Sequence, residues 1–197
     1  MSPMIKNFLI TGKKQVGKSY LINMLISELG LTCSGFQTLP YYIGEERKGF
    51  YFHSFEETVT YENNLPVNVQ TGKDSFIGIG QIFSTLGVEC LNSSIFSNRD
   101  CIVMDELGKI ERNEQLFHLA VSNVLDSETP VLAVIKKETI AWLELIKKRK
   151  DVIIYDLDEL PQQKVLEEIK QKVEDILRLK KKRSIREDEA KCAKTNQ

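Results

Sequence analysis

The sequence predicts an α/β fold in which a doubly wound, mostly parallel sheet contains an antiparallel hairpin insertion. From residue 101 onwards, short apolar runs alternate with amphipathic stretches, as parallel strands alternate with crossover helices. Residues 8–11 form an apolar strand that stops at Gly12 and is followed at once by a helical stretch. Residues 41–55 hold two aromatic runs around a polar turn, which parallel strands alone would not produce.

Size and composition fit one globular domain. The chain has 197 residues, 42% hydrophobic and 28% charged, which suits one sizeable core rather than a disordered, fibrous or membrane protein. The 27 basic and 28 acidic residues give a net charge of -1, so no overall field draws the protein to nucleic acid or an anionic bilayer. We expect one domain over residues 1–177 and a basic, disordered tail over residues 178–197.

The cysteines and the N-terminal segment both indicate a cytoplasmic protein. No C-x-x-C pair occurs, which favours reduced thiols over a disulfide or zinc framework, so we expect no metal held by cysteine. The apolar run near the N-terminus is too short and interrupted for a signal peptide or a membrane span. The four cysteines are Cys33, Cys90, Cys101 and Cys192.

In the first half of the chain, strands are separated by turn signals. The helix that begins at Gly17 ends at Gly30, because glycine readily adopts the left-handed conformation that stops a helix. Residues 56–84 are polar and lack a sustained period, so we assign no element to them. The predicted strands lie at residues 8–11, 31–37, 41–43 and 50–55, with a hairpin turn at residues 44–49.

In the second half, helices and strands alternate. Residues 101–104 are a continuous apolar run, typical of a strand buried on both faces of a parallel sheet. In the last helix Val165, Ile169 and Val173 recur at helical spacing, so one face packs on the sheet. The predicted helices lie at residues 88–96, 113 or 114–125, 139–148 and 161–180, and the strands at residues 101–104, 131–135 and 152–155.

A phosphate-binding loop lies between the first predicted strand and helix. Residues 12–19 read G-K-K-Q-V-G-K-S and match the Walker A pattern G-x-x-x-x-G-K-S/T. Its glycines let successive N–H groups converge on an oxyanion, and the helix N-terminus adds positive charge. Lys18 would reach the β- and γ-phosphates, and Ser19 would place its hydroxyl on Mg²⁺. The candidate nucleotide-binding residues are Gly12, Lys13, Lys14, Gln15, Val16, Gly17, Lys18, Ser19 and Tyr20.

Two carboxylates follow the apolar run of residues 101–104, where a Walker B aspartate belongs. Parallel strands end at one edge of a sheet, which would bring Asp105 close to Ser19 and let it hold Mg²⁺ through a water. Glu106 could polarise a water for in-line attack on the γ-phosphorus, which hydrolysis requires. Alone the pair would indicate an ordinary solvated strand end; with the loop it indicates metal-assisted hydrolysis.

Nearby lysines have two interpretations each. Lys109 could place positive charge near the developing charge on the γ-phosphate, or it could pair with Glu111 or Asp105. Lys13 and Lys14 could add charge to the loop or face solvent. The candidate catalytic residues are Lys18, Glu106 and Lys109, and the candidate metal ligands are Ser19 and Asp105.

With these motifs, residues 4–175 resemble the small P-loop nucleoside-triphosphatase family, which includes thermophilic archaeal and bacterial members and a human cancer-related nucleoside triphosphatase. The most specific part of the resemblance is the run I-V-M-D-E-L-G-K-I-E at residues 102–111, and residues 35–38 add to it. The resemblance implies a RecA-like core. It also implies slow, broad-specificity, Mg²⁺-dependent release of phosphate from ATP, GTP and other nucleoside triphosphates.

The chain departs from the family pattern at three places. Residues 39–40 are Leu-Pro, where members commonly have an acidic residue. Residues 13–15 are bulky and polar, where members usually have small residues or Pro-Gly. Lys136 follows the strand at residues 131–135, where a polar residue, sometimes histidine, often faces the nucleotide. These departures bear on water positioning and turnover more than on nucleotide binding.

Other polar and aromatic signals have structural interpretations. His53 and His118 are not at metal spacing and are expected on the hairpin surface and on a helix. Trp142 is expected in the core. The basic runs at residues 147–150 and 178–183 end helices, where cations complement the helix dipole and stay solvated, so nucleic-acid binding is not expected.

Two other functions remain open. A P-loop nucleoside or nucleotide kinase would need an arginine-bearing lid, yet arginines do not cluster between Gly108 and Leu145. A nucleotide-binding switch or adaptor with vestigial catalysis would contact a partner through the hairpin and residues 56–84. A regulatory GTPase is disfavoured because no N-K-x-D sequence occurs.

Overall fold

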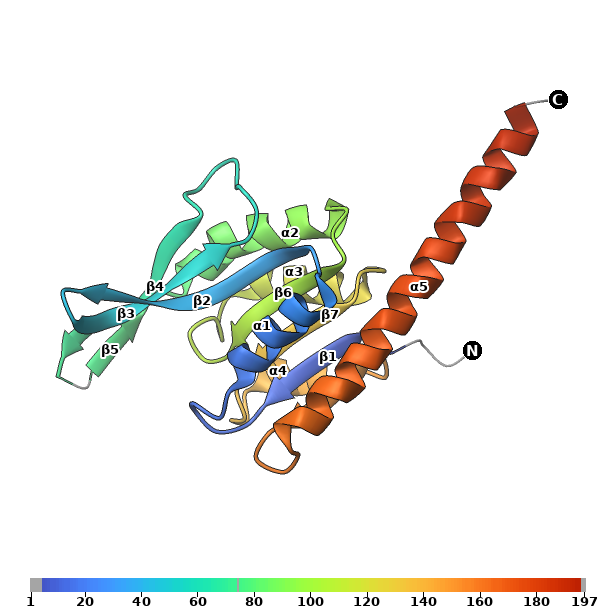
Figure 1. The fold of residues 1–197 in the computed structure, drawn as a ribbon. Coiled ribbons are helices and arrows are strands. Elements are labelled where there is room, and N and C mark those ends of the chain that lie inside the picture. The colour runs from blue at the N-terminus through green and yellow to red at the C-terminus, as the bar shows by residue number, and fades with distance from the viewer. Residues whose placement is uncertain (1–4, 74, 196–197) are drawn as a thin grey trace.

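The chain forms a single sheet in the order β5-β4-β3-β2-β6-β7-β1-β8 (Figure 1). A computed structural model describes residues 5–73 and 75–195, with side chains described as far as residue 183. The strands are β1 (Asn7–Thr11), β2 (Cys33–Ile43), β3 (Glu46–Ser54), β4 (Asn64–Gly72), β5 (Ser75–Gly78), β6 (Cys101–Leu107), β7 (Val131–Ile135) and β8 (Val152–Asp156). The helices are α1 (Lys18–Leu29), the π-helix η1 (Phe83–Gly87), α2 (Val88–Phe96), α3 (Gln115–Asp126), α4 (Ala141–Lys147) and α5 (Gln162–Thr195).

The predicted parallel sheet is confirmed for β2, β6, β7, β1 and β8, which pair in parallel with one another in this order. Every residue of β1 and β7 is buried, as expected for strands covered by helices on both faces. Parallel strands end at a common edge, so the loops that follow β1, β6 and β7 lie side by side. Because β7 separates β6 from β1, it occupies the middle of that edge.

Two hydrophobic cores cover the two faces of the sheet, as a doubly wound fold requires. Ile102 and Met104 of β6 pack in the core formed with α2, α3 and α4. Cys101 and Val103, which alternate with them, pack in the core formed with α1 and α5. This period of two explains why residues 101–104 are all apolar, since both faces of the strand meet helices.

An antiparallel wing extends one side of the sheet, and we use this name for β3, β4, β5 and the second half of β2. The predicted hairpin is confirmed as β2 and β3, which pair antiparallel from Phe36↔Ser54 to Ile43↔Glu46. The strands predicted at residues 31–37 and 41–43 are one continuous strand. The region left unassigned, residues 56–84, supplies β4 and β5, so the insertion is larger than a hairpin. In Figure 1 the wing projects away from the helices.

Two elements run further than the sequence predicts. Strand β6 continues to Leu107 because Asp105 and Leu107 still pair with β7, so both carboxylates of the acidic pair lie within the strand. Helix α5 continues to Thr195, where a disordered tail is predicted from residue 178. Residues 178–195 are rich in lysine, arginine, glutamate and alanine and contain neither glycine nor proline, which favours a helix. Figure 1 shows this end of α5 projecting beyond the sheet.

The cysteines described by the structure are free thiols. Cys33 and Cys101 are in register on β2 and β6, with their Sγ atoms 3.3 Å apart. None of the helices in the described part of the chain combines the length and the apolar character that crossing a membrane needs.

Candidate functional site

The loop between β1 and α1 has the backbone conformation that its two glycines allow. Gly12 and Gly17 have φ angles of 138° and 97°, which disfavour any residue with a side chain. A Cβ on Gly12 would meet Val16 Cγ1 at 3.0 Å, and one on Gly17 would meet Gln162 Nε2 at 3.3 Å. Gln15 also adopts a positive φ, 66°, at the tip of the loop. The loop therefore curls tightly and ends at Gly17, the N-cap of α1.

Lys18 is buried inside this curl. Its side chain is only 8% exposed, and its Nζ donates hydrogen bonds to the carbonyl oxygens of Gly12 at 3.1 Å and Lys13 at 2.8 Å. The ammonium group is thereby fixed at the centre of the loop. By contrast, the side chains of Lys13, Lys14 and Gln15 are exposed, so the two extra lysines face solvent. Ser19 and Tyr20 are exposed in the first turn of α1.

A carboxylate that the sequence did not predict lies at this loop. The backbone N–H of Lys13 donates to Asp158 Oδ1 at 3.1 Å and Oδ2 at 3.2 Å. Lys137 bridges Asp158 and Asp156, at 2.8 Å from each, and holds the Asp158 pKa below its usual range. A loop amide thus already binds an anionic group. The signal that could have revealed it is the presence of two aspartates at and just after the end of β8, Asp156 and Asp158, at the same sheet edge.

Asp105 lies at this edge and is almost fully buried, at 4% exposed. Burial raises its pKa to about 6, the neighbouring Ser19 hydroxyl lowers the pKa, and the charge of Glu106 raises it. The charge of Lys18 lowers it as well, so the structure brings Lys18, Ser19 and Asp105 together. A hydroxyl and a carboxylate are hard oxygen donors, the chemistry that Mg²⁺ prefers, so this pair fits that ion.

The buried carboxyl of Asp105 makes stability depend on pH. Its pKa is about 6 in the folded protein against 3.8 ordinarily, so between these values the folded state binds more protons and stability falls as pH rises. The loss is complete above about pH 6 and amounts to at most about 3 kcal/mol. We expect Asp105→Asn to melt several degrees above the parent at pH 7 and near it at pH 4, measured calorimetrically in EDTA without nucleotide. An equal difference at both pH values would contradict this origin.

Glu106 lies next to Asp105 but is partly open to solvent. Its backbone N–H donates to Thr38 Oγ1 at 3.3 Å. Its Oε2 lies 2.9 Å from the Nζ of Lys136, the residue expected to face the nucleotide after β7. The structure therefore joins Glu106 and Lys136 in an ion pair. The sequence indicated Glu106 as a catalytic residue and Lys136 as a departure from the family pattern, but it did not predict their contact.

The turn after β6 is held by a buried carboxylate, Glu111. Its Oε1 accepts the backbone N–H of Gly108, and burial raises its pKa to about 7. Trp142 Nε1 donates to the Gly108 carbonyl at 3.3 Å, and its ring stacks on His118, with centroids 4.3 Å apart. His118 Nε2 lies 2.8 Å from the Glu111 carbonyl oxygen. Trp142 is a core residue as predicted, and these three residues together fix the turn.

Lys109 does not pair as the sequence suggested. Its Nζ contacts Glu138, on the loop after β7, rather than Glu111 or Asp105. Glu111 is turned inward to Gly108, which removes it from reach of an exposed lysine. Lys109 itself remains 59% exposed at the same edge of the sheet.

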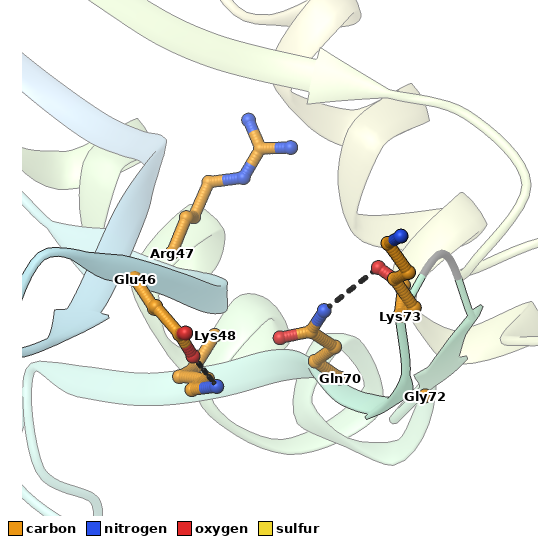
Figure 2. A pocket seen from close by; sticks show the side chains of 6 residues that line it. All are labelled: Glu46, Arg47, Lys48, Gln70, Gly72 and Lys73. Atoms are coloured by element: carbon orange, nitrogen blue, oxygen red, sulfur yellow. Dashed lines mark hydrogen bonds and ion pairs between the residues drawn. The ribbon is translucent and has the colours of Figure 1, made fainter.

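A separate hollow of about 650 Å³ lies on the wing, away from the phosphate loop (Figure 2). Figure 2 shows the Arg47 side chain extending from β3, Glu46 paired with Lys48, and Gln70 hydrogen-bonded to the Lys73 carbonyl at 3.0 Å. The lining residues of the hollow belong to β3, β4 and the turn that follows. The candidate site at the sheet edge is therefore distinct from this hollow.

The strand order, the glycine loop after β1 and the carboxylates at the end of β6 define a P-loop fold. A model of the NTPase family matches residues 7–170, and the chain belongs to this family. "Nucleoside-triphosphatase THEP1" of Thermotoga maritima is 36% identical over 163 residues, covering 82% of this chain and 91% of that protein. The human "Cancer-related nucleoside-triphosphatase" is 29% identical over 170 residues, covering 78% and 89%.

Two solved structures share the fold. THEP1 from the hyperthermophile Aquifex aeolicus superposes with a TM-score of 0.63 at 24% identity, over 83% of this chain and 96% of that one. The solution structure of a human cancer-related nucleoside triphosphatase gives a TM-score of 0.60 at 23% identity, over 83% and 95%. The predicted family resemblance and the P-loop α/β fold are both confirmed.

Proposed function

We propose that this protein is a cytoplasmic nucleoside-triphosphatase that hydrolyses ATP, GTP and other nucleoside triphosphates slowly to the diphosphate and inorganic phosphate, with Mg²⁺ as cofactor. The observation that supports this most directly is the convergence of Lys18, Ser19, Asp105 and Glu106 at one sheet edge, although the loop and the acidic pair are far apart in sequence. Membership of the NTPase family and the activity for which the relatives are named support the same conclusion.

In this proposal the loop from Gly12 to Tyr20 binds the phosphates. Its backbone amides and the N-terminus of α1 attract negative charge. Lys18 exchanges its hydrogen bonds to loop carbonyls for bonds to the β- and γ-phosphate oxygens. Ser19 and Asp105 would hold Mg²⁺, which supplies charge neutralisation at the phosphate oxygens when bound.

The chemical step in this proposal is attack by water. Glu106 orients a water whose oxygen forms a bond to the γ-phosphorus as the bond from that phosphorus to the bridging oxygen breaks. The diphosphate leaves with that electron pair, and the proton lost by the water passes to the released phosphate or solvent. Lys109 adds positive charge at the same edge, where it offsets charge on the γ-phosphate oxygens.

Phosphate release tests the proposal. We expect the parent to release phosphate from ATP and from GTP in the presence of Mg²⁺, with loss of release in EDTA and restoration by added Mg²⁺. Tight binding of a triphosphate without turnover would favour the adaptor or switch instead. Disappearance of the triphosphate only when a nucleoside or nucleotide acceptor is present would favour a kinase.

A further inference from the structure

Lys136 occupies the central position of the candidate site. It follows β7, and β7 lies between β6, which holds the acidic pair, and β1, which leads into the phosphate loop. Its backbone N–H donates to the Leu107 carbonyl at 2.9 Å, which fixes it to the end of β6. In the strand order, Lys136 therefore stands between the two halves of the site.

The side chain of Lys136 is directed along the end of β6 towards Glu106. Its stem passes against Gly108, where a Cβ would lie only 2.7 Å from Lys136 Cγ. Its Nζ then lies 2.9 Å from Glu106 Oε2. The absence of a side chain at Gly108 thus makes room for the lysine stem. Both the backbone N–H and the Nζ of Lys136 contact residues of β6.

We propose that Lys136 is a positioning residue for the hydrolysis proposed above. It holds Oε2 of the Glu106 carboxylate and leaves Oε1 free to orient the attacking water. The proposal rests on the proposed function, because it assigns Lys136 a role only through Glu106. Phosphoryl transfer depends more on positioning than on the strength of a base, so a fixed carboxylate is useful even when an ion pair reduces its basicity.

The local charge supports this role. Asp105, Glu106 and Glu111 gather near the end of β6, and Lys136 acts electrostatically on the first and last of them as well. Without that cation, Glu106 would be repelled by the neighbouring carboxylates and by a triphosphate. The pair is partly exposed, 39% for Lys136 and 29% for Glu106, so it contributes little to folding stability. The ion pair between Lys136 and Glu106 therefore acts mainly by orienting the Glu106 carboxylate.

A double-mutant cycle with Glu106 tests the assignment. We expect Lys136→Met to lower kcat at least about tenfold, with KM changed by less than about twofold, and Lys136→Arg to restore most of kcat. In the Glu106→Gln background, Lys136→Met should have no further effect, because the group it positions is gone. The measurements are steady-state phosphate release from ATP with Mg²⁺, together with melting temperature.

Lys170→Met is the matched control. Lys170 forms an ion pair of the same length, 2.9 Å, with Glu28, and the two side chains are 30% and 36% exposed. This pair joins α5 to α1, far from the sheet edge, so its loss should leave kcat unchanged. A fall in kcat of equal size in both lysine variants would overturn the proposal.

Other outcomes also decide against it. If Lys136→Met retains the parent kcat, or lowers activity by the same factor in the parent and in the Glu106→Gln background, Lys136 does not act through Glu106. A rise in KM with kcat preserved would indicate direct binding of the triphosphate instead. If the parent itself releases no phosphate, the proposed function fails and this role fails with it.

Gly108→Ala provides an independent variant that keeps the lysine charge. Its methyl group would displace the Lys136 stem, so we expect kcat to fall while KM stays near the parent value. The effect should disappear in the Lys136→Met background. Should Lys136→Met fail to fold, Gly108→Ala decides the matter, and an unchanged kcat in that variant would overturn the proposal.

Discussion

Glu106→Gln is expected to release phosphate at least about a hundredfold more slowly than the parent while binding ATP with the same affinity. The substitution keeps the shape of the side chain and the backbone hydrogen bond to Thr38. Under the proposed function it removes the negative charge that would orient and polarise the water, a role exercised only in the reaction. Removal of such an interaction lowers kcat without weakening substrate binding.

The measurement is single-turnover phosphate release alongside calorimetric titration of ATP with Mg²⁺. Glu28→Gln is the control, since Glu28 also pairs with a lysine, Lys170, but on the outer surface between α1 and α5. Hydrolysis by Glu106→Gln at the parent rate would show that another group positions the water. Loss of ATP binding would show instead that Glu106 contributes to binding the substrate before the reaction.

Lys18→Ala is expected to weaken ATP binding by about a hundredfold and to abolish measurable turnover. A hydrogen bond from a charged group contributes about 1.5–3 kcal/mol, and one lysine can make two such bonds to phosphate oxygens. Lys18 is already buried and fixed in the loop by the carbonyls of Gly12 and Lys13, so it has little conformational freedom to lose when it binds phosphate.

Competition against a fluorescent ATP analogue measures this loss of affinity, with Lys170→Ala as the control. Comparison of ATP with adenosine separates the phosphate contribution from that of the base. If Lys18→Ala weakens both equally, the loop has lost its shape rather than a phosphate contact. An unchanged ATP affinity would remove Lys18 from the binding site altogether.

The parallel half of the fold could be predicted because each of its strands carries its own signal. Residues 101–104 and 131–135 are buried on both faces, which leaves continuous apolar runs in the sequence. The wing carries a weaker signal for a physical reason. All four residues of β5 are exposed, so no buried face marks that strand. In β4, Leu65, Val67 and Val69 do alternate with other residues, but the alternation is short and only Val67 is fully buried, and Asn64 and Pro66 are residues typical of turns.

The site was predictable to the extent that its parts are contiguous in sequence. The glycine loop and the acidic pair each form a local motif. The contacts between Lys136 and Glu106 and between Lys109 and Glu138 depend on β6 and β7 being neighbours, which no short segment encodes. The contact of Asp158 with the loop depends in the same way on β8 lying beside β1.

The central place of β7 also has a consequence for the order in which the site can assemble. The loop at residues 12–19 and the carboxylates at residues 105 and 106 are synthesised first, yet they belong to strands that touch only through β7. A growing chain that has not reached residue 131 therefore lacks the strand that sets their distance. The two motifs can therefore take up their final spacing only after residues 131–135 have been synthesised and have paired with β6 and β1.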